Sequence, residues 1–224
     1  MARETEIKLR VQNAGLLRKK LKRLKARPAT AGSGRVHEMN VIFDTPQGGL
    51  AKHGQLLRIR TETPEGRGKK GRGGGLRRVV LTFKRPTMPL EAAPSMEGRA
   101  VAAGRHKVRE EIEVEVTDGA NLTKIFEGLG MRGWFRYEKY RTTFTLPAAS
   151  RWAQGLLIEL DETPIGTFVE LEGEAGAIDR AAKELGYSPK EYVLKNYLVL
   201  YVEECKRKGE PPKDMLFGGE KRGR

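Results

Sequence analysis

Eight short segments of the chain alternate strictly between apolar and polar residues. Alternation with a period of two places the two kinds of side chain on opposite faces of a β-strand. The apolar positions hold mainly Ile, Leu, Val and Phe, so each strand should carry one face that needs to be covered. The expected strands are residues 4–11, 41–44, 56–61, 79–84, 110–116, 137–146, 156–162 and 167–173.

Four other stretches have helical spacing. In residues 14–26, Leu17, Leu21 and Leu24 share one face, and six Lys or Arg residues occupy the rest. The last helix is expected to begin at Ser188-Pro189, a cap followed by proline at the first helical position. The four expected helices are residues 14–26, 121–129, 177–185 and 189–206.

Three segments break these patterns. Residues 63–75 repeat glycine and basic residues and predict a surface loop. Residues 85–107 are rich in Pro, Ala and Gly and predict a long connection between strands. We therefore expect one folded domain over residues 1–206 and a basic flexible tail over residues 207–224.

The polar faces of the expected strands are sorted by charge. Residues two apart lie on the same side of a strand, so each group brings like charges together. For a single pair, a solvent-facing surface is the simpler interpretation, but an exposed sheet face would also mix in Thr, Gln and Ser. The acidic groups are Glu4/Glu6, Glu111/Glu113/Glu115, Glu159/Asp161 and Glu170/Glu172, and the basic ones are Lys8/Arg10, Arg58/Arg60, Lys84 and Lys139/Arg141.

A sheet that closes with its apolar face outward, under the helices, would place these charges in its lumen. Burying so many ions is tolerable only if they neutralise one another or a ligand. Carboxylate pairs supply the hard oxygen ligands that Mg²⁺ or Mn²⁺ prefers, and Lys and Arg match phosphate oxygens. The pattern therefore predicts a site for a triphosphate with a divalent metal.

The composition of the chain indicates which partners and which cellular compartment to expect. The chain has 43 Lys and Arg against 29 Asp and Glu, a formal charge of +14, which favours polyanionic partners. Its single cysteine, Cys205, excludes an intrachain disulfide. No stretch approaches the length of a signal sequence or membrane span, so we expect a cytoplasmic protein without membrane contact.

Two further residue types carry weaker signals. Asp44, in Phe43-Asp44-Thr45-Pro46, is expected to form an Asx-type turn rather than to bind metal. His37, His53 and His106 lack ligand spacing and are expected to be ordinary surface or loop residues. The candidate chemistry therefore rests on carboxylates and cations.

The ordered motifs resemble the CYTH domain, or triphosphate tunnel metalloenzyme, superfamily over residues 4–201. Its signature Glu-x-Glu-x-Lys is matched by Glu4, Glu6 and Lys8. The series continues through Phe43-Asp44-Thr45-Pro46, Leu57-Arg58-Ile59-Arg60, Leu81-Thr82-Phe83-Lys84, Arg109-Glu110-Glu111-Ile112-Glu113, Lys139-Tyr140-Arg141, Glu159-Leu160-Asp161 and Glu170-Leu171-Glu172. The resemblance implies an α+β fold, a closed antiparallel eight-stranded β-barrel with a charged lumen and helices packed outside.

The resemblance also implies roles for individual residues. The expected metal ligands are Glu4, Glu6, Glu113, Asp161, Glu170 and Glu172. The expected phosphate ligands are Lys8, Arg58, Arg60, Lys84, Lys139, Arg141 and, from the last helix, Lys195. The expected catalytic residues are Glu4, Glu6, Lys8 and Glu111.

Three functions fit these residues. The leading hypothesis is Mg²⁺- or Mn²⁺-dependent hydrolysis of tripolyphosphate, thiamine triphosphate or a nucleoside triphosphate, with water activated by metal and a tunnel acid. The alternative on the same scaffold is a class IV adenylate cyclase, which converts ATP to cyclic AMP and pyrophosphate. A non-enzymatic polyanion or nucleic-acid binder would explain the basic helix, loop and tail but not the ordered acidic pairs. A homodimer is compatible with each of them.

Overall fold

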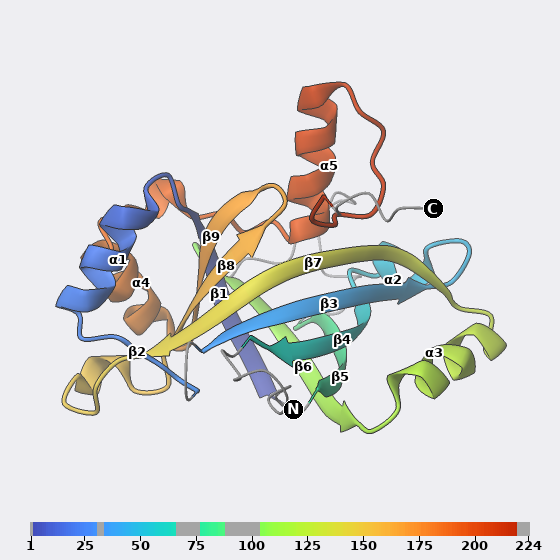
Figure 1. Cartoon of the computed structure of the whole chain (residues 1–224), viewed down its shortest axis with the longest axis horizontal. Coiled ribbons are helices and arrows are strands. Elements are labelled where there is room, and N and C mark those ends of the chain that lie inside the picture. Colours follow the sequence, from blue (N-terminus) through green and yellow to red (C-terminus); the bar gives the residue numbers. More distant parts are fainter. Residues whose placement is uncertain (1, 31–33, 66–76, 88–103, 219–224) are drawn as a thin grey trace, which may run out of the picture.

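The computed structural model describes residues 2–30, 34–65, 77–87 and 104–218. Parts of the expected loop, connection and tail, namely residues 66–75, 88–103 and 219–224, lie outside the described residues. The described chain forms a closed antiparallel barrel of eight strands with one short additional strand and with helices outside it (Figure 1). The predicted fold class is therefore confirmed.

Each barrel strand pairs with a neighbour on both sides. The order around the barrel is β7, β3, β4, β5, β6, β1, β9 and β8, and pairing between β8 and β7 closes it. The short strand β2 (Arg27–Pro28) extends the sheet beside β7. The barrel strands are β1 (Ala2–Arg10), β3 (Arg35–Asp44), β4 (Leu56–Pro64), β5 (Arg78–Pro86), β6 (Lys107–Val116), β7 (Arg132–Thr145), β8 (Leu157–Thr163) and β9 (Gly166–Glu172).

All eight expected strands are present, but several are longer than the alternation indicates. Strand β3 begins at Arg35, six residues before its expected start at Val41. It is paired with β4 on one side and β7 on the other along most of its length. Two ladders of backbone hydrogen bonds hold these residues extended, although their side chains include the polar run His37 to Asn40.

The helices lie outside the barrel. The first three expected helices are confirmed within a few residues of their predicted ends, and Asn13 caps α1 as expected by accepting a hydrogen bond from Leu16 N at 2.9 Å. The helices are α1 (Ala14–Arg23), α2 (Gly49–Lys52), α3 (Gly119–Gly128), α4 (Ala175–Glu184) and α5 (Tyr197–Lys208), with 3₁₀ turns at η2 (Arg151–Ala153) and η3 (Pro189–Glu191). None of the helices in the described parts of the chain is long and apolar enough to cross a membrane.

The expected last helix is wrong in its first half. Ser188-Pro189 starts only the turn η3, and α5 begins later, at Tyr197 after the cap residue Asn196. Between them, Val193 exchanges two backbone hydrogen bonds with Lys8 of β1, at 3.0 and 2.8 Å. This tertiary pairing keeps the segment extended and overrides the local helix signal.

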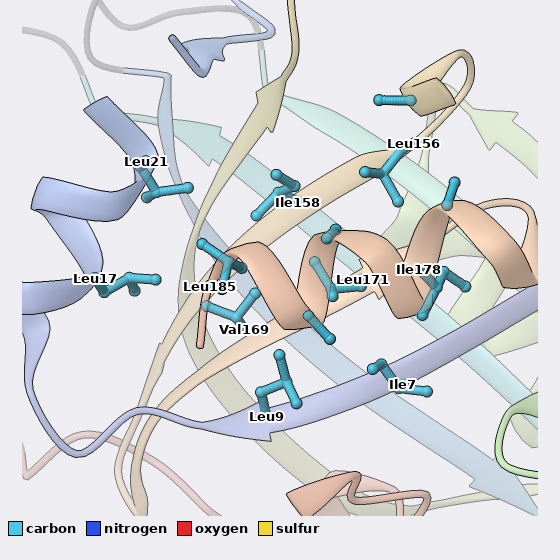
Figure 2. Close-up of a cluster of buried hydrophobic side chains, with 14 residues drawn as sticks. Ile7, Leu9, Leu17, Leu21, Leu156, Ile158, Val169, Leu171, Ile178 and Leu185 are labelled. Carbon is cyan, nitrogen blue, oxygen red and sulfur yellow. The ribbon is translucent and has the colours of Figure 1, made fainter. Parts of the chain in front are cut away.

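Strands β1, β9 and β8 pack their apolar outer face against α4 and α1. Ile7 and Leu9 of β1 and Val169 and Leu171 of β9 surround α4, where Ile178 is fully buried (Figure 2). Leu17 and Leu21 of α1 complete this cluster. The apolar outer face that alternation predicts is therefore covered by helices, and the polar face is left to the lumen.

Cover is incomplete at β6. Ile112 and Val114 on its outer face are 44% and 53% exposed. Helix α3 instead packs near β4, where Ile59 and Phe43 join Phe126 in a separate apolar cluster. The expectation that helices cover every apolar strand face is thus wrong for this strand, as far as the described residues reach.

The described part of the expected tail contacts the barrel at Met215. Helix α5 continues to Lys208, and Met215 beyond it is 1% exposed and pairs with Tyr137 of β7. Met215 N donates to Arg136 O at 2.9 Å and Glu138 N donates to Met215 O at 3.0 Å. The segment up to residue 218 therefore belongs to the barrel wall, because an apolar side chain and open strand hydrogen bonds hold it there.

Two smaller expectations have different outcomes. Asp44 forms the predicted turn, since its Oδ1 accepts from Thr45 N and Leu50 N at 2.7 and 2.8 Å. His106 is not a surface residue: it is 8% exposed, and its Nε2 lies 2.9 Å from Asp179 Oδ1 of α4. Packing between β6 and α4 buries it.

The core cluster around α4 should dominate stability. Replacing the fully buried Ile178 by alanine leaves a cavity between α4 and the sheet, which should lower the free energy of unfolding by about 2–5 kcal/mol. Ile125→Ala in α3, where the side chain is 57% exposed, is the matched control and should change it by less than about 0.5 kcal/mol. Chemical denaturation measures both, and equal losses would contradict this account of the core.

Candidate active site in the barrel lumen

A cavity of about 390 Å³ occupies the barrel. Among the described residues, its wall carries nine carboxylates and nine Lys or Arg side chains, so their formal charges balance. The carboxylates belong to Glu4, Glu6, Glu38, Glu62, Glu111, Glu113, Glu159, Glu170 and Glu172. The cations belong to Lys8, Arg58, Arg60, Arg78, Lys84, Lys107, Arg109, Lys139 and Arg141.

Strand β1 brings Glu4, Glu6 and Lys8 to one side of this cavity. Both oxygens of Glu4 accept from Lys84 Nζ, at 2.8 and 2.7 Å. Glu6 Oε1 accepts from Lys8 Nζ at 3.1 Å and from Lys107 Nζ at 2.5 Å. Burial alone would raise the pKa of Glu6, but its lysine neighbours outweigh burial and hold this pKa well below its ordinary value.

Strand β7 supplies a second cationic group, Lys139 and Arg141. Asp161 of β8 accepts from Lys139 Nζ at 2.9 Å, from Arg141 Nε and Nη2 at 2.7 and 2.6 Å, and from the Tyr197 hydroxyl at 2.7 Å. Glu38 of β3 lies 3.5 Å from Lys139 Nζ. Burial opposes ionisation of Glu38, yet Lys139 and Arg141 lower its pKa to about 2.

Asp161 does not line the cavity. Its side chain is 0% exposed, and both of its oxygens are held by the partners just described. The structure therefore sets it apart from the other expected metal ligands. Its position behind Lys139 and Arg141 makes it the group that orients these two cations.

Arg58 and Arg60 of β4 face the lumen with different partners. Arg58 donates to the Tyr137 hydroxyl at 3.2 Å and to Thr82 Oγ1 at 3.1 Å. Arg60 donates to Glu113 Oε1 at 3.3 Å. Because neutral hydroxyls take two of the Arg58 hydrogen bonds, its charge is less fully neutralised than that of Arg141.

Carboxylates outnumber nearby cations on the part of the cavity wall formed by β1, β6, β8 and β9. We call this group the acidic surplus. Burial, together with Glu4 and Glu159, raises the pKa of Glu172 to about 8. Burial also raises the pKa of Glu159 to about 7, even though Arg141 opposes the shift. Burial raises the pKa of Glu111 as well, against the effect of Lys84. Among the described residues, Glu172 has no ion-pair partner.

This surplus fits a divalent cation in charge and in donor chemistry. Carboxylate oxygens are the ligands of Mg²⁺ and Mn²⁺, and a cation beside Glu172 would remove the repulsion that disfavours its ionised form. Within the described residues, no three His, Cys, Asp or Glu side chains already converge into a metal site. The fit therefore rests on charge and ligand type, and the residues of the surplus are Glu4, Glu111, Glu159 and Glu172.

Lys195 does not reach the cavity. Its side chain is 55% exposed, and its Nζ lies 2.5 Å from Glu203 Oε1 of α5. Asn196, Tyr197 and Leu198 line the cavity instead. Since the segment before α5 is extended rather than helical, Lys195 is turned to solvent, and Tyr197 is the residue of this region that contacts the charged network.

Several lumen residues escaped the sequence analysis. Lys107 and Arg109 continue the parity of Glu111 and Glu113 along β6, but the expected strand began too late to include them. Burial lowers the pKa of Lys107 to about 8, although Glu6 opposes the shift. Strand parity could have found both cations, Glu38 and Tyr137, which shares the parity of Lys139 and Arg141, whereas Tyr197 carries no such signal in the sequence.

The chain belongs to the CYTH domain family. The family's sequence profile matches residues 2–197, nearly the whole chain. Among curated protein sequences, none matches this chain.

Solved structures share the fold at low sequence identity. The PH1819 protein of Pyrococcus horikoshii is 22% identical, with a TM-score of 0.62 over 90% of this chain and 99% of that protein. A Vibrio parahaemolyticus protein, provisionally described as an adenylate cyclase, is 18% identical, with a TM-score of 0.61 over 87% and 94%. HpAC1 from Hippeastrum, described as a provisional adenylyl cyclase with a dominant triphosphatase activity, is 20% identical, with a TM-score of 0.51 over 93% and 97%.

The network around Asp161 gives a test of buried charge. Asp161→Asn leaves Lys139 and Arg141 without their full counter-charge, which should lower the free energy of unfolding by about 3 kcal/mol or more. Glu203→Gln removes the exposed partner of Lys195 and should cost at most about 1 kcal/mol. Urea denaturation of both variants measures the difference, and similar losses would show that Asp161 does not orient the pair.

Proposed function

We propose that this protein hydrolyses a triphosphate inside the barrel in a divalent-metal-dependent reaction. The observation that carries the proposal is the cavity wall, which holds nine basic side chains for phosphate oxygens and a surplus of carboxylates at Glu172. Membership in the CYTH family and the triphosphatase activity described for HpAC1 support the same reaction class. A pure anion receptor would not need these acids.

The cations would bind the substrate and neutralise the leaving phosphate. Arg58 and Arg60 of β4 and Lys139 and Arg141 of β7, the two strands that flank β3, face the same cavity. Planar guanidinium groups can hold two phosphate oxygens each, and charge on the leaving group develops in the transition state. Asp161 and Tyr197 would keep Lys139 and Arg141 in position while phosphate displaces their other partners.

Glu111 would accept the proton of the attacking water. Burial raises the pKa of Glu111, which makes this carboxylate a stronger proton acceptor than an ordinary glutamate. A divalent cation held by Glu4, Glu6, Glu170, Glu172 and Glu113 would supply Lewis-acid neutralisation of phosphate oxygens when bound. Glu159, with a pKa of about 7, is a further proton acceptor in the same wall.

Cyclisation of ATP is the second candidate, and one feature of the cavity favours it. Ile42, Leu198 and Tyr137 form an apolar part of the wall that phosphates do not need. A cavity of about 390 Å³ is also within the range of about 300–1,000 Å³ that organic ligands occupy. The same cations would then hold ATP while its ribose 3′-hydroxyl replaces water as nucleophile.

A substrate panel separates the two reactions. The protein is incubated with tripolyphosphate, thiamine triphosphate or ATP, each with Mg²⁺ or Mn²⁺ and each with a chelator. We expect orthophosphate release that the chelator abolishes. Cyclic AMP with pyrophosphate would establish the second candidate, and no metal-dependent turnover of any triphosphate would overturn the proposal.

Glu172→Gln should separate activity from stability. The substitution removes one carboxylate from the acidic surplus and should lower kcat by about 100-fold. This is the size of effect seen when one strong electrostatic contact to the transition state is lost. Glu172 has no ion-pair partner among the described residues, so the substitution leaves no lysine or arginine unpaired. Initial rates under the best metal and substrate measure the first effect, and Glu203→Gln is the control.

The stability of the same variant should depend on pH in a defined direction. The folded pKa of Glu172, about 8, lies above the unfolded value of about 4.5, so the native state favours the protonated form. The stabilisation that Glu172 gains from its higher folded-state pKa is fully present below pH 4.5 and is lost as the pH rises through 8. Glu172→Gln should therefore be more stable than the natural protein at pH 9, on the order of 5 kcal/mol, and equally stable at pH 4.

Metal addition gives the complementary outcome. Mg²⁺ or Mn²⁺ should raise the melting temperature of the natural protein at pH 9 and raise that of Glu172→Gln much less. An identical metal-induced shift in the two proteins would remove Glu172 from the ligand set.

A further inference from the structure

Among the residues that the structure describes, the excess of positive charge lies outside the cavity. The cavity wall balances nine carboxylates against nine cations, while the whole chain carries a formal charge of +14. Binding of a triphosphate inside the barrel therefore does not account for the excess. Its location on the exterior needs a separate explanation.

Helix α1 and the residues that follow it hold half of that excess. Residues 11–34 contain seven Lys or Arg and no Asp or Glu. Six of the seven are exposed, and Arg23 alone among them makes a described ion pair, with Glu184 at 3.5 Å. We call these six the α1 cationic surface: Arg18, Lys19, Lys22, Arg23, Lys25 and Arg27.

The other face of α1 is fixed against the protein. Leu17 and Leu21 are buried in the main core cluster, and Lys20 Nζ donates to Leu185 O at 2.5 Å. Helix α1 consequently lies beside α4, outside the barrel (Figure 1). The cations project from a helix that is already held in place, so a partner would not have to order it.

Lys25 is held in an unfavourable backbone conformation. Its φ of 57° is the only positive φ of a non-glycine residue in the described ranges. The position follows the C-cap Leu24, where glycine is favoured because it has no Cβ to clash. A lysine at this point lowers stability locally, and such outliers are found where a side chain is needed for function.

We propose that the α1 cationic surface binds the phosphodiester backbone of a nucleic-acid duplex, at a site separate from the catalytic cavity. A helix of 10 residues is about 15 Å long, and duplex DNA presents a charge every 1.7 Å or so along its axis. The surface can therefore meet several phosphates at once. The absence of acids from residues 11–34 leaves nothing there to repel them.

A lipid surface fits these observations less well. Helices that bind membranes insert an apolar face, but Leu17 and Leu21 of α1 are committed to the core. Leu16, 50% exposed, is the exposed large apolar side chain that α1 retains. A partner that needs charge without apolar insertion is the better match.

The experiment compares two variants of the full chain with equal loss of charge. One replaces Arg18, Lys19, Lys22 and Lys25 by Gln, and the control replaces the exposed Lys52, Lys124, Arg132 and Lys206 by Gln. Binding to short duplex DNA and duplex RNA is measured over a range of salt concentrations. The α1 variant should lose about tenfold or more in affinity and flatten the log–log salt slope by about 3–4, whereas the control should change little.

Three outcomes would overturn the proposal: equal losses in both variants, no binding of either duplex by the natural protein, or binding only to phosphatidylserine vesicles. Binding of either duplex supports the proposal. The duplex that binds with higher affinity shows whether the partner is DNA or RNA. Turnover in the cavity should be unchanged in the α1 variant, so failure here is distinct from failure of the proposed catalysis.

Lys25→Gly provides an independent check. Glycine relieves the positive φ, so the melting temperature should rise while duplex affinity falls. An unchanged affinity would remove Lys25 from the surface, and a lower melting temperature would show that the lysine is there for stability.

Discussion

Neutralisation of buried charge is the constraint on which this structure depends. The barrel strands turn their apolar side chains outward, most of them against helices, so their ions must face inward, where unpaired charges are costly. Nine carboxylates and nine cations meet around the cavity and satisfy this requirement. The closed sheet can hold these ions because it brings opposite charges from different strands into contact.

The carboxylates of the barrel are not equally well paired with cations. This difference determines the chemistry that the site can support. Asp161 accepts hydrogen bonds from Lys139, Arg141 and Tyr197 and is fully buried, so it holds these two cations in place. Glu172 lacks an ion-pair partner in the described chain, and burial and acidic neighbours raise its pKa. The ion pairs of Asp161 therefore stabilise the fold. The carboxylate of Glu172 lacks a compensating positive charge, which a metal ion can supply.

The balanced lumen also separates two uses of charge. Inside, the described carboxylates and cations are equal in number, which suits a small ligand carried with its metal. Outside, α1 gathers cations without any acid, which suits an extended polyanion. The total of +14 therefore says little about the catalytic site, even though both regions consist of Lys and Arg.

The sequence by itself determined the strands and the faces of Glu4, Arg58 and Glu170, because alternation is a local property of an extended chain. Only the tertiary structure decided which charges meet. Because Val193 pairs with Lys8, α5 begins later than expected and Lys195 faces solvent. Closure of the barrel buries Asp161 behind Lys139 and Arg141. These outcomes depend on strand register between segments far apart in the chain, which no local pattern encodes.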